Sequence, residues 1–179
     1  MRDENAPRAR RVSVSTSEFL RGDEQPDYAD AFEIHVPETD ERTAEQFARC
    51  ALEQAQWPVR WTIRIAHRFL LRFKAAGRSS PNRIFGFRIL TSRPDVVHLE
   101  ASSSVMRGVL VARRADPTRA VMETYVFYNS RKARVLWRIA GPIHRRVAPY
   151  LMEHAASFPN SAGSRSVSRS ERATAGGIK

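Results

Sequence analysis

Residues 95–128 read DVVHLEASSSVMRGVLVARRADPTRAVMETYVFY, and their pattern sets the fold class. Apolar and polar residues alternate through much of it, and β-branched and aromatic residues are frequent, which is typical of strands. We therefore predict strands over 95–101, 105–114 and 118–128. Parallel neighbours would need a crossover of about a dozen residues or more. Strands joined this tightly are therefore expected to form an antiparallel meander.

Working outward toward the N-terminus, residues 84–90 show the same pattern and add a fourth strand to the meander. The segments 92–95 and 115–118 carry Ser, Asp and Pro, the residues that favour tight turns. Residues 31–36 also alternate and stop at Pro37, which predicts an edge or entry strand.

Two helices are expected between that first strand and the meander. Thr43 and Gln46 have the spacing of a capping box, in which each side chain satisfies a backbone N–H of the first helical turn. Pro58 suits the first position of a second helix, predicted over 59–75 and terminated by Gly77.

A long helix is expected after the meander, over 131–156, with Pro142 and Pro149 kinking it or breaking it into turns. Its expected apolar face is Leu136, Ile139, Ile143, Val147, Tyr150 and Leu151. A sheet cannot bury its inner face alone, and a helix of this length would cover it. The expected fold is α+β, a curved antiparallel sheet wrapped around a long C-terminal helix.

The chain is expected to hold one domain, 11–156, between two disordered tails. The tails, 1–10 and the Ser/Arg-rich 157–179, have little apolar surface to bury. No run of residues is long and apolar enough to span a membrane, and the lone cysteine, Cys50, fits a reducing compartment, so we expect a cytoplasmic protein. Neither a metal-binding motif nor a cofactor motif is present, and we expect neither ligand.

The net charge of +11 is unevenly distributed. Residues 23–56 hold ten acids against two arginines, and residues 57–156 hold nineteen Lys and Arg against five acids. This asymmetry has three interpretations: an anionic partner for the basic part, docking of the acidic and basic parts on each other, or a genome of high GC content that favours Arg codons.

Three short motifs, DYADAF at 27–32, WP at 57–58 and GPIHRR at 141–146, resemble those of a bacterial family. This family is domain of unknown function 2867, within the START-like and polyketide-cyclase superfamily, and the similarity covers 27–156. The resemblance implies a helix-grip fold around a cavity for apolar or amphipathic ligands, and it implies no particular reaction. The chain departs from the family at 100–104, where EASSS replaces a strand motif that contains Asp and His.

The first functional hypothesis is a binder of a small apolar or amphipathic molecule between sheet and helix. The predicted lining is Val97, Leu99, Met106, Leu110, Trp137, Ile143 and His144. A register slip of one residue would exchange every strand residue in this set for its neighbour.

The second hypothesis is a cyclase- or hydrolase-like enzyme that uses the same cavity. Histidines at 67, 98 and 144 lack metal-ligand spacing, and no nucleophile motif is present, so catalytic residues stay unassigned. Polar residues on the strands that could act as acid or base are His98, Glu100, Arg107, Glu123 and Thr124.

The third hypothesis is binding to an anionic surface, either lipid headgroups or nucleic acid. Arg60, Arg64, Arg68 and Arg72 are spaced by four residues and would form one basic ridge on a helix. The tail arginines 165, 169 and 172 would add phosphate contacts. The alternative is a solvated helix face. The identity of the ligand, any reaction and the oligomeric state stay open.

Overall fold

The computed structural model describes residues 7–15, 24–65 and 81–158. Within these ranges, the side chains at 62, 64 and 65 are not described. The elements in chain order are β1 (Arg10–Val12), β2 (Tyr28–His35), α1 (Ala44–Glu53), α2 (Trp57–Ile65), β3 (Arg83–Ile84), β4 (Phe87–Ser92), β5 (Val96–Ser102), β6 (Met106–Asp116), β7 (Arg119–Tyr128) and α3 (Arg131–Ala156).

The strands form a seven-stranded antiparallel sheet in the order β1-β2-β7-β6-β5-β4-β3. The predicted meander is confirmed, because β4 to β7 are consecutive neighbours in that order. The edge position predicted for β2 is wrong. The strand pairs with β7 along its whole length and with the three residues of β1 on its other side.

The predicted strand over 84–90 is divided into β3 and β4 by a two-residue hairpin. Phe85 and Gly86 at its tip have φ angles of 48° and 94°, the left-handed conformations that match a hairpin to the twist of its strands. Gly86 therefore marks a turn. The turn is not evident from the sequence, because its first residue, Phe85, is apolar and continues the strand pattern.

Both helices predicted between β2 and the meander are present. The Thr43 Oγ1 accepts from the backbone N–H of Gln46 at 3.2 Å, and the Gln46 Oε1 accepts from the backbone N–H of Thr43 at 2.9 Å, so the capping box is confirmed. The second helix, α2, begins at Trp57, which places Pro58 one residue later in its first turn than predicted. The end predicted near Gly77 lies outside the described residues.

The last helix, α3, has the predicted bounds and is continuous through both prolines, so the expected break is absent. A proline in a helix frees the carbonyl four residues before it. Here those carbonyls belong to Arg138 and Arg145, which are exposed, and water can satisfy them.

The buried face of α3 is rotated from the predicted one. It consists of Ala133, Trp137, Ala140, Gly141, Ala148, Leu151, Met152, Ala155 and Ala156. The prediction followed the large side chains, but Ile139 is 56% exposed and Ile143 is 39% exposed. Alanine and glycine let a helix approach a sheet closely, so small residues can define a buried face as well as large ones.

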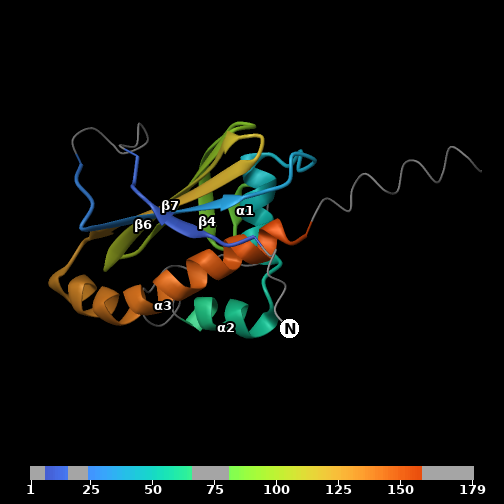
Figure 1. Cartoon of the computed structure of the whole chain (residues 1–179). Helices are drawn as coiled ribbons and strands as arrows, with labels where there is room; N and C mark the ends of the chain where they lie inside the picture. The colour runs from blue at the N-terminus through green and yellow to red at the C-terminus, as the bar shows by residue number, and fades with distance from the viewer. Residues whose placement is uncertain (1–6, 16–23, 66–80, 159–179) are drawn as a thin grey trace, which may run out of the picture.

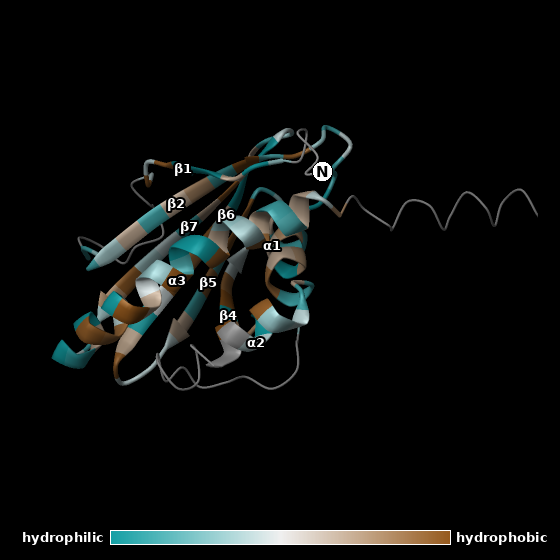
Figure 2. Ribbon diagram, turned by 60° about the horizontal axis from the view of Figure 1, so that its bottom comes forward, coloured by the Kyte–Doolittle hydropathy of each residue, from teal (hydrophilic) through white to brown (hydrophobic). Residues whose placement is uncertain are grey.

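All three helices lie on one face of the sheet, and Figures 1 and 2 show α3 running across it beside α1 and α2. A core cluster of residues from α1, the C-terminal half of α3 and the inner face of the sheet fills the space between these layers. A smaller cluster on the opposite face includes Val111, Tyr125 and Phe127, with Val14 packed against it.

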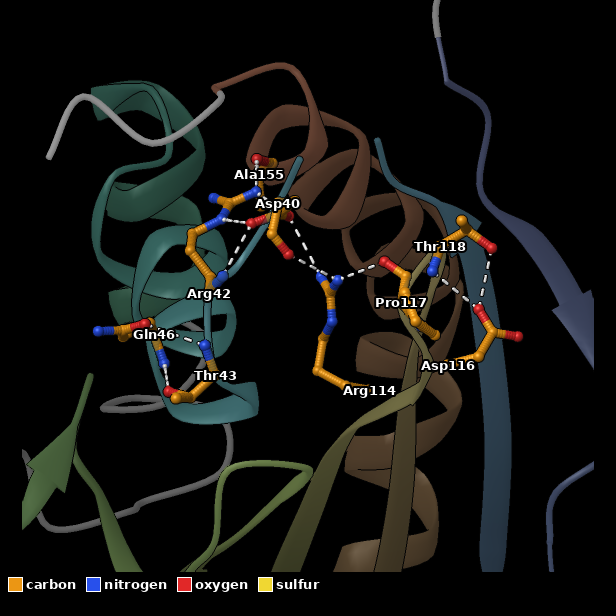
Figure 3. Close-up of polar contacts among 9 residues, drawn as sticks. All are labelled: Asp40, Arg42, Thr43, Gln46, Arg114, Asp116, Pro117, Thr118 and Ala155. Carbon is orange, nitrogen blue, oxygen red and sulfur yellow. Dashed lines mark hydrogen bonds and ion pairs between the residues drawn. The ribbon is translucent and has the colours of Figure 1, made fainter. Parts of the chain in front are cut away.

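A buried ion-pair network joins three parts of the chain at one end of the sheet (Figure 3). Arg42 binds Asp40 through two hydrogen bonds of 2.7 Å and donates to the carbonyl of Ala155 at the end of α3. Arg114 of β6 donates to Asp40 as well, and to the carbonyl of Pro117 in the β6–β7 turn. The network therefore ties the segment before α1 to the end of α3 and to the sheet.

Acids of the segment 23–56 pair repeatedly with the basic remainder of the domain. The pairs are Glu24 with Arg107, Asp30 with His144, Glu33 with Arg119, and Asp40 with Arg114. This pattern supports docking of the acidic and basic parts on each other. Part of the predicted N-terminal tail belongs to the folded domain. The backbone N–H of Ala9 donates to the Glu153 carboxylate at 3.1 Å, and Arg10 begins β1.

Candidate functional site

An apolar cavity of about 120 Å³ lies between the inner face of the sheet and α3. Its walls come from α1, α2, β4, β6, β7 and α3, and its lining is Leu52, Ile63, Phe87, Met106, Gly108, Val109, Leu110, Met122, Thr124, Val126, Trp137, Ala140, Ile143, His144, Val147, Ala148 and Leu151. The cavity is open to the surface, and Ile143 of its lining is 39% exposed.

Small residues contribute to this space. Ala140 and Ala148 are the α3 residues that face the sheet in the middle of the cavity wall, and Gly108 has no side chain to project from β6. A large side chain at any of these positions would fill part of the volume. The space between sheet and helix is therefore a consequence of side-chain size at particular positions.

Thr124 and His144 are the polar side chains of the lining. The His144 Nε2 lies 3.1 Å from the Oδ1 of Asp30, and the Oδ2 of Asp30 accepts from the Tyr28 hydroxyl at 2.5 Å. Asp30 is 1% exposed. The three side chains form a continuous hydrogen-bonded chain that runs from a strand of the sheet to the cavity wall.

The protonation states follow from the environment of Asp30. Burial raises the pKa of this carboxyl, but the hydrogen bond and charge of His144, the Tyr28 hydroxyl and the charge of Arg11 together lower it below its usual value. An ionised carboxylate only accepts hydrogen bonds, so the His144 Nε2 carries the proton of this contact. In the neutral imidazole, Nδ1 is then the acceptor.

The pKa of Tyr28 shifts in the opposite direction to that of Asp30 and is raised. Burial, followed by the hydrogen bond to Asp30 and its charge, raises the pKa of the phenol to about 12, although Arg145 opposes the shift. Tyr28 therefore remains a hydrogen-bond donor to Asp30 over the whole neutral range.

Trp137 connects this polar chain to the cavity. Its ring centroid lies 5.0 Å from that of Tyr28 and 5.6 Å from that of His144, and its indole packs across Gly141. Among the described residues, no group accepts a hydrogen bond from its buried Nε1.

The structure brings together five of the seven residues predicted to bind a ligand. Met106, Leu110, Trp137, Ile143 and His144 line the cavity. The other two, Val97 and Leu99, also lie on the inner face of the sheet, but they are fully buried in the core cluster that includes α1. They are separated from the cavity because α1 covers the part of β5 that carries them.

Four of the five strand residues proposed as acid or base point away from the cavity. His98, Glu100, Arg107 and Glu123 alternate with inward-facing residues of β5, β6 and β7 and lie on the opposite face. Thr124 is the exception, because it lies on the inner face. Glu123 instead accepts from the Ser15 hydroxyl at 2.5 Å and is buried.

The predicted basic ridge is described only in part. Arg60 is partly exposed on α2, the side chain at 64 is not described, and Arg68, Arg72 and His67 lie outside the described residues. The ridge therefore stays a prediction. Cys50 is buried in the core cluster that includes α1, and burial raises the pKa of its thiol.

Sequence reasoning missed Tyr28 and Asp30 as partners of His144. A signal was present, because Asp30 interrupts a period of two in which Phe32 and Ile34 face the core. A charged residue in register with core positions indicates a buried partner. What the pattern lacks is the identity of that partner, which is 114 residues away.

Within residues 7–15, 24–65 and 81–158, no cluster of three or more His, Cys, Asp and Glu side chains is arranged to hold a metal ion. In the same part of the chain, no helix has both the length and the apolarity needed to cross a membrane. No family model, no curated protein and no solved structure matches the chain.

Proposed function

We propose that this protein binds one small apolar or amphipathic molecule in the cavity between the sheet and α3, and that its fold is of the helix-grip, START-like kind. The antiparallel sheet with a long C-terminal helix across one face supports the fold. The observation that carries the function is the cavity itself, whose lining is apolar except at Thr124 and His144.

The size of the cavity limits the ligand. An engineered apolar cavity of roughly 150 Å³ in another protein holds one benzene molecule. The cavity here, at about 120 Å³, suits a single ring or a short alkyl chain. A longer ligand would extend through the opening of the cavity.

The polar end of the cavity favours an amphipathic ligand over a pure hydrocarbon. His144 is held by Asp30, so its ring orientation is fixed from behind and its other nitrogen is available to accept a hydrogen bond from a ligand hydroxyl. A single oriented polar group in an apolar pocket is how such sites set the orientation of a ligand.

Native mass spectrometry of protein purified from cells tests the proposal. The parent chain is expected to carry an extra mass that is lost on denaturation. Ala140→Leu places a larger side chain in the cavity wall and is expected to abolish that mass, while the control Ala115→Leu, at an exposed position of β6, retains it. A parent chain without bound mass that also fails to bind single-ring and short-chain alkyl compounds would contradict the proposal.

A second candidate function is proton-transfer catalysis in the same cavity, which the Asp30–His144 pair favours. A carboxylate that orients a histidine and stabilises its protonated form is the arrangement of many general bases. The test follows from the first experiment. If the parent chain converts the bound molecule and His144→Gln does not, the protein is an enzyme. If both the parent and His144→Gln bind the molecule and release it unchanged, the protein is a carrier.

A further inference from the structure

The outward face of α3 carries a line of exposed apolar side chains. Val135, Ile139 and Ile143 follow one another at intervals of four residues and are 60%, 56% and 39% exposed. Figure 2 shows hydrophobic positions on this helix interspersed with hydrophilic ones. Exposed aliphatic residues are common singly, but a row on one helix indicates an interaction surface.

Basic side chains flank this row. The exposed cations of the helix between its first residue and residue 146 are Arg131, Lys132, Arg134, Arg138, Arg145 and Arg146. The first acid of the helix is Glu153, near its end. Within the described part of the chain, none of these six cations forms a salt bridge with a carboxylate.

Two exposed tryptophans lie on the neighbouring helix. Trp57 and Trp61 are one turn apart on α2 and are 75% and 62% exposed. Figure 1 shows α2 beside α3 on the helical side of the sheet. Ile63 of α2 and Ile143 of α3 both line the cavity, so both helices border it.

We propose that the outer face of α3, residues 131–146, together with Trp57 and Trp61, docks on an anionic lipid bilayer. A helix with an apolar row between basic residues lies in the plane of the membrane interface, with its aliphatic side chains among the acyl chains and its cations at the headgroups. Tryptophan is favoured at the same depth because its ring is apolar and its N–H is polar.

The chemistry of the face distinguishes a bilayer from nucleic acid. Duplex DNA would use the cations alone, because phosphate contacts supply the binding free energy and exposed isoleucine gains nothing from them. A bilayer uses both kinds of side chain. The docking surface does not depend on the cavity, so failure of either proposal leaves the other standing.

Co-sedimentation of the full chain with vesicles is the test. Binding is expected to vesicles of equal parts phosphatidylglycerol and phosphatidylcholine, and not to vesicles of phosphatidylcholine alone. Arg134→Gln with Arg138→Gln is expected to weaken it by tenfold or more, since each charge near an anionic surface contributes roughly fivefold. The matched control, Arg83→Gln with Arg88→Gln, removes two exposed arginines from the β3–β4 hairpin and is expected to leave binding within about twofold of the parent.

The apolar row is tested by Val135→Gln with Ile139→Gln, which preserves charge and suits a helix. Vesicle binding is expected to weaken by about tenfold, because two partly exposed side chains can no longer enter the acyl region. Far-ultraviolet circular dichroism checks that both variants keep the fold. The proposal is overturned if the parent does not bind anionic vesicles, if the two arginine pairs have equal effects, or if the apolar pair is without effect while the parent binds a DNA duplex.

Discussion

At the scale of single residues, Asp30 determines the chemistry of the cavity. It is a fully buried carboxylate on an otherwise apolar face of β2, and it is stable there because Tyr28 and His144 each donate to one of its oxygens. A buried charge without such partners would cost several kcal/mol. The Asp30–His144 hydrogen bond therefore links the sheet to α3 and fixes the orientation of the histidine in the cavity wall.

The ionisation of Tyr28 provides a prediction at this scale. Its pKa in the folded chain is about 12, against an ordinary value of 10.0. The folded chain therefore retains a proton that the unfolded chain loses, and the stabilising effect is complete below pH 10 and lost as the pH rises toward 12. We expect the advantage of the parent over Tyr28→Phe in free energy of unfolding to shrink across this range.

Chemical unfolding of the parent and Tyr28→Phe at a series of alkaline pH values measures the effect. Spectrophotometric titration of the folded parent near 295 nm, an absorption wavelength of tyrosinate, is an independent check. A difference spectrum between the two proteins that titrates near pH 10 would show that Tyr28 is not held by Asp30.

At the scale of elements, α3 combines two features that rarely occur together in a long helix: internal prolines and a buried face built mainly from alanine. The prolines are tolerated because the carbonyls they free belong to the exposed residues Arg138 and Arg145. The alanines allow close approach to the sheet and leave the space that becomes the cavity. Both features lie in the same helix that orients His144.

Gly141 provides the prediction for this element. It lies in the middle of α3, where glycine is less favourable than alanine by about 1 kcal/mol. A Cβ added there would meet the Trp137 Nε1 at 3.4 Å and the Arg145 Nη1 at 3.7 Å, which are ordinary contact distances. We therefore expect Gly141→Ala to raise the free energy of unfolding by several tenths of a kcal/mol, up to about 1.

Thermal and urea unfolding of Gly141→Ala against the parent measure this gain. Alanine at the exposed Pro142 is a useful companion variant, because it restores a backbone N–H to the same turn. A loss of stability in Gly141→Ala would show that the indole of Trp137 requires closer contact with the helix than these distances indicate.

At the scale of the whole molecule, the buried network around Asp40 holds the domain together. Asp40 and Arg42 have side chains that are 1% and 6% exposed, and Arg114 approaches the same carboxylate. Asp40→Ala leaves two arginines without their buried partner. Removing one member of a buried ion pair costs about 3–5 kcal/mol, so we expect a loss of that size, measured by urea unfolding.

Glu38→Ala is the matched control, because Glu38 is an exposed acid two residues away and its loss is expected to be nearly neutral. The pH dependence has a defined sign. Burial raises the pKa of Asp40, but Arg42 and Arg114 outweigh this and lower it. The stabilisation from Asp40 is therefore present above its ordinary value of 3.8 and lost as the pH falls below it. Asp40→Ala is expected to show a weaker acid dependence than the parent, and equal acid dependence would contradict this role.

Elements with local signals could be predicted from the amino-acid sequence alone. The meander over 84–128, the capping box at Thr43 and both ends of α3 were predictable because period, turn residues and caps act over a few residues. The register of β6 was left open by the sequence, because both of its faces carry buried apolar residues, Met106 and Leu110 on the cavity side and Val111 on the other.

Which distant residues meet is visible only in the folded chain. His144 pairs with Asp30, which is 114 residues away in the sequence. Val97 and Leu99 pack in the core cluster that includes α1 and do not line the cavity. Which face of α3 is buried also depends on how the helix packs on the sheet, because alanine can be buried or exposed at little cost in free energy. Contacts between distant segments follow from how whole layers pack, and no local pattern in the chain specifies that packing.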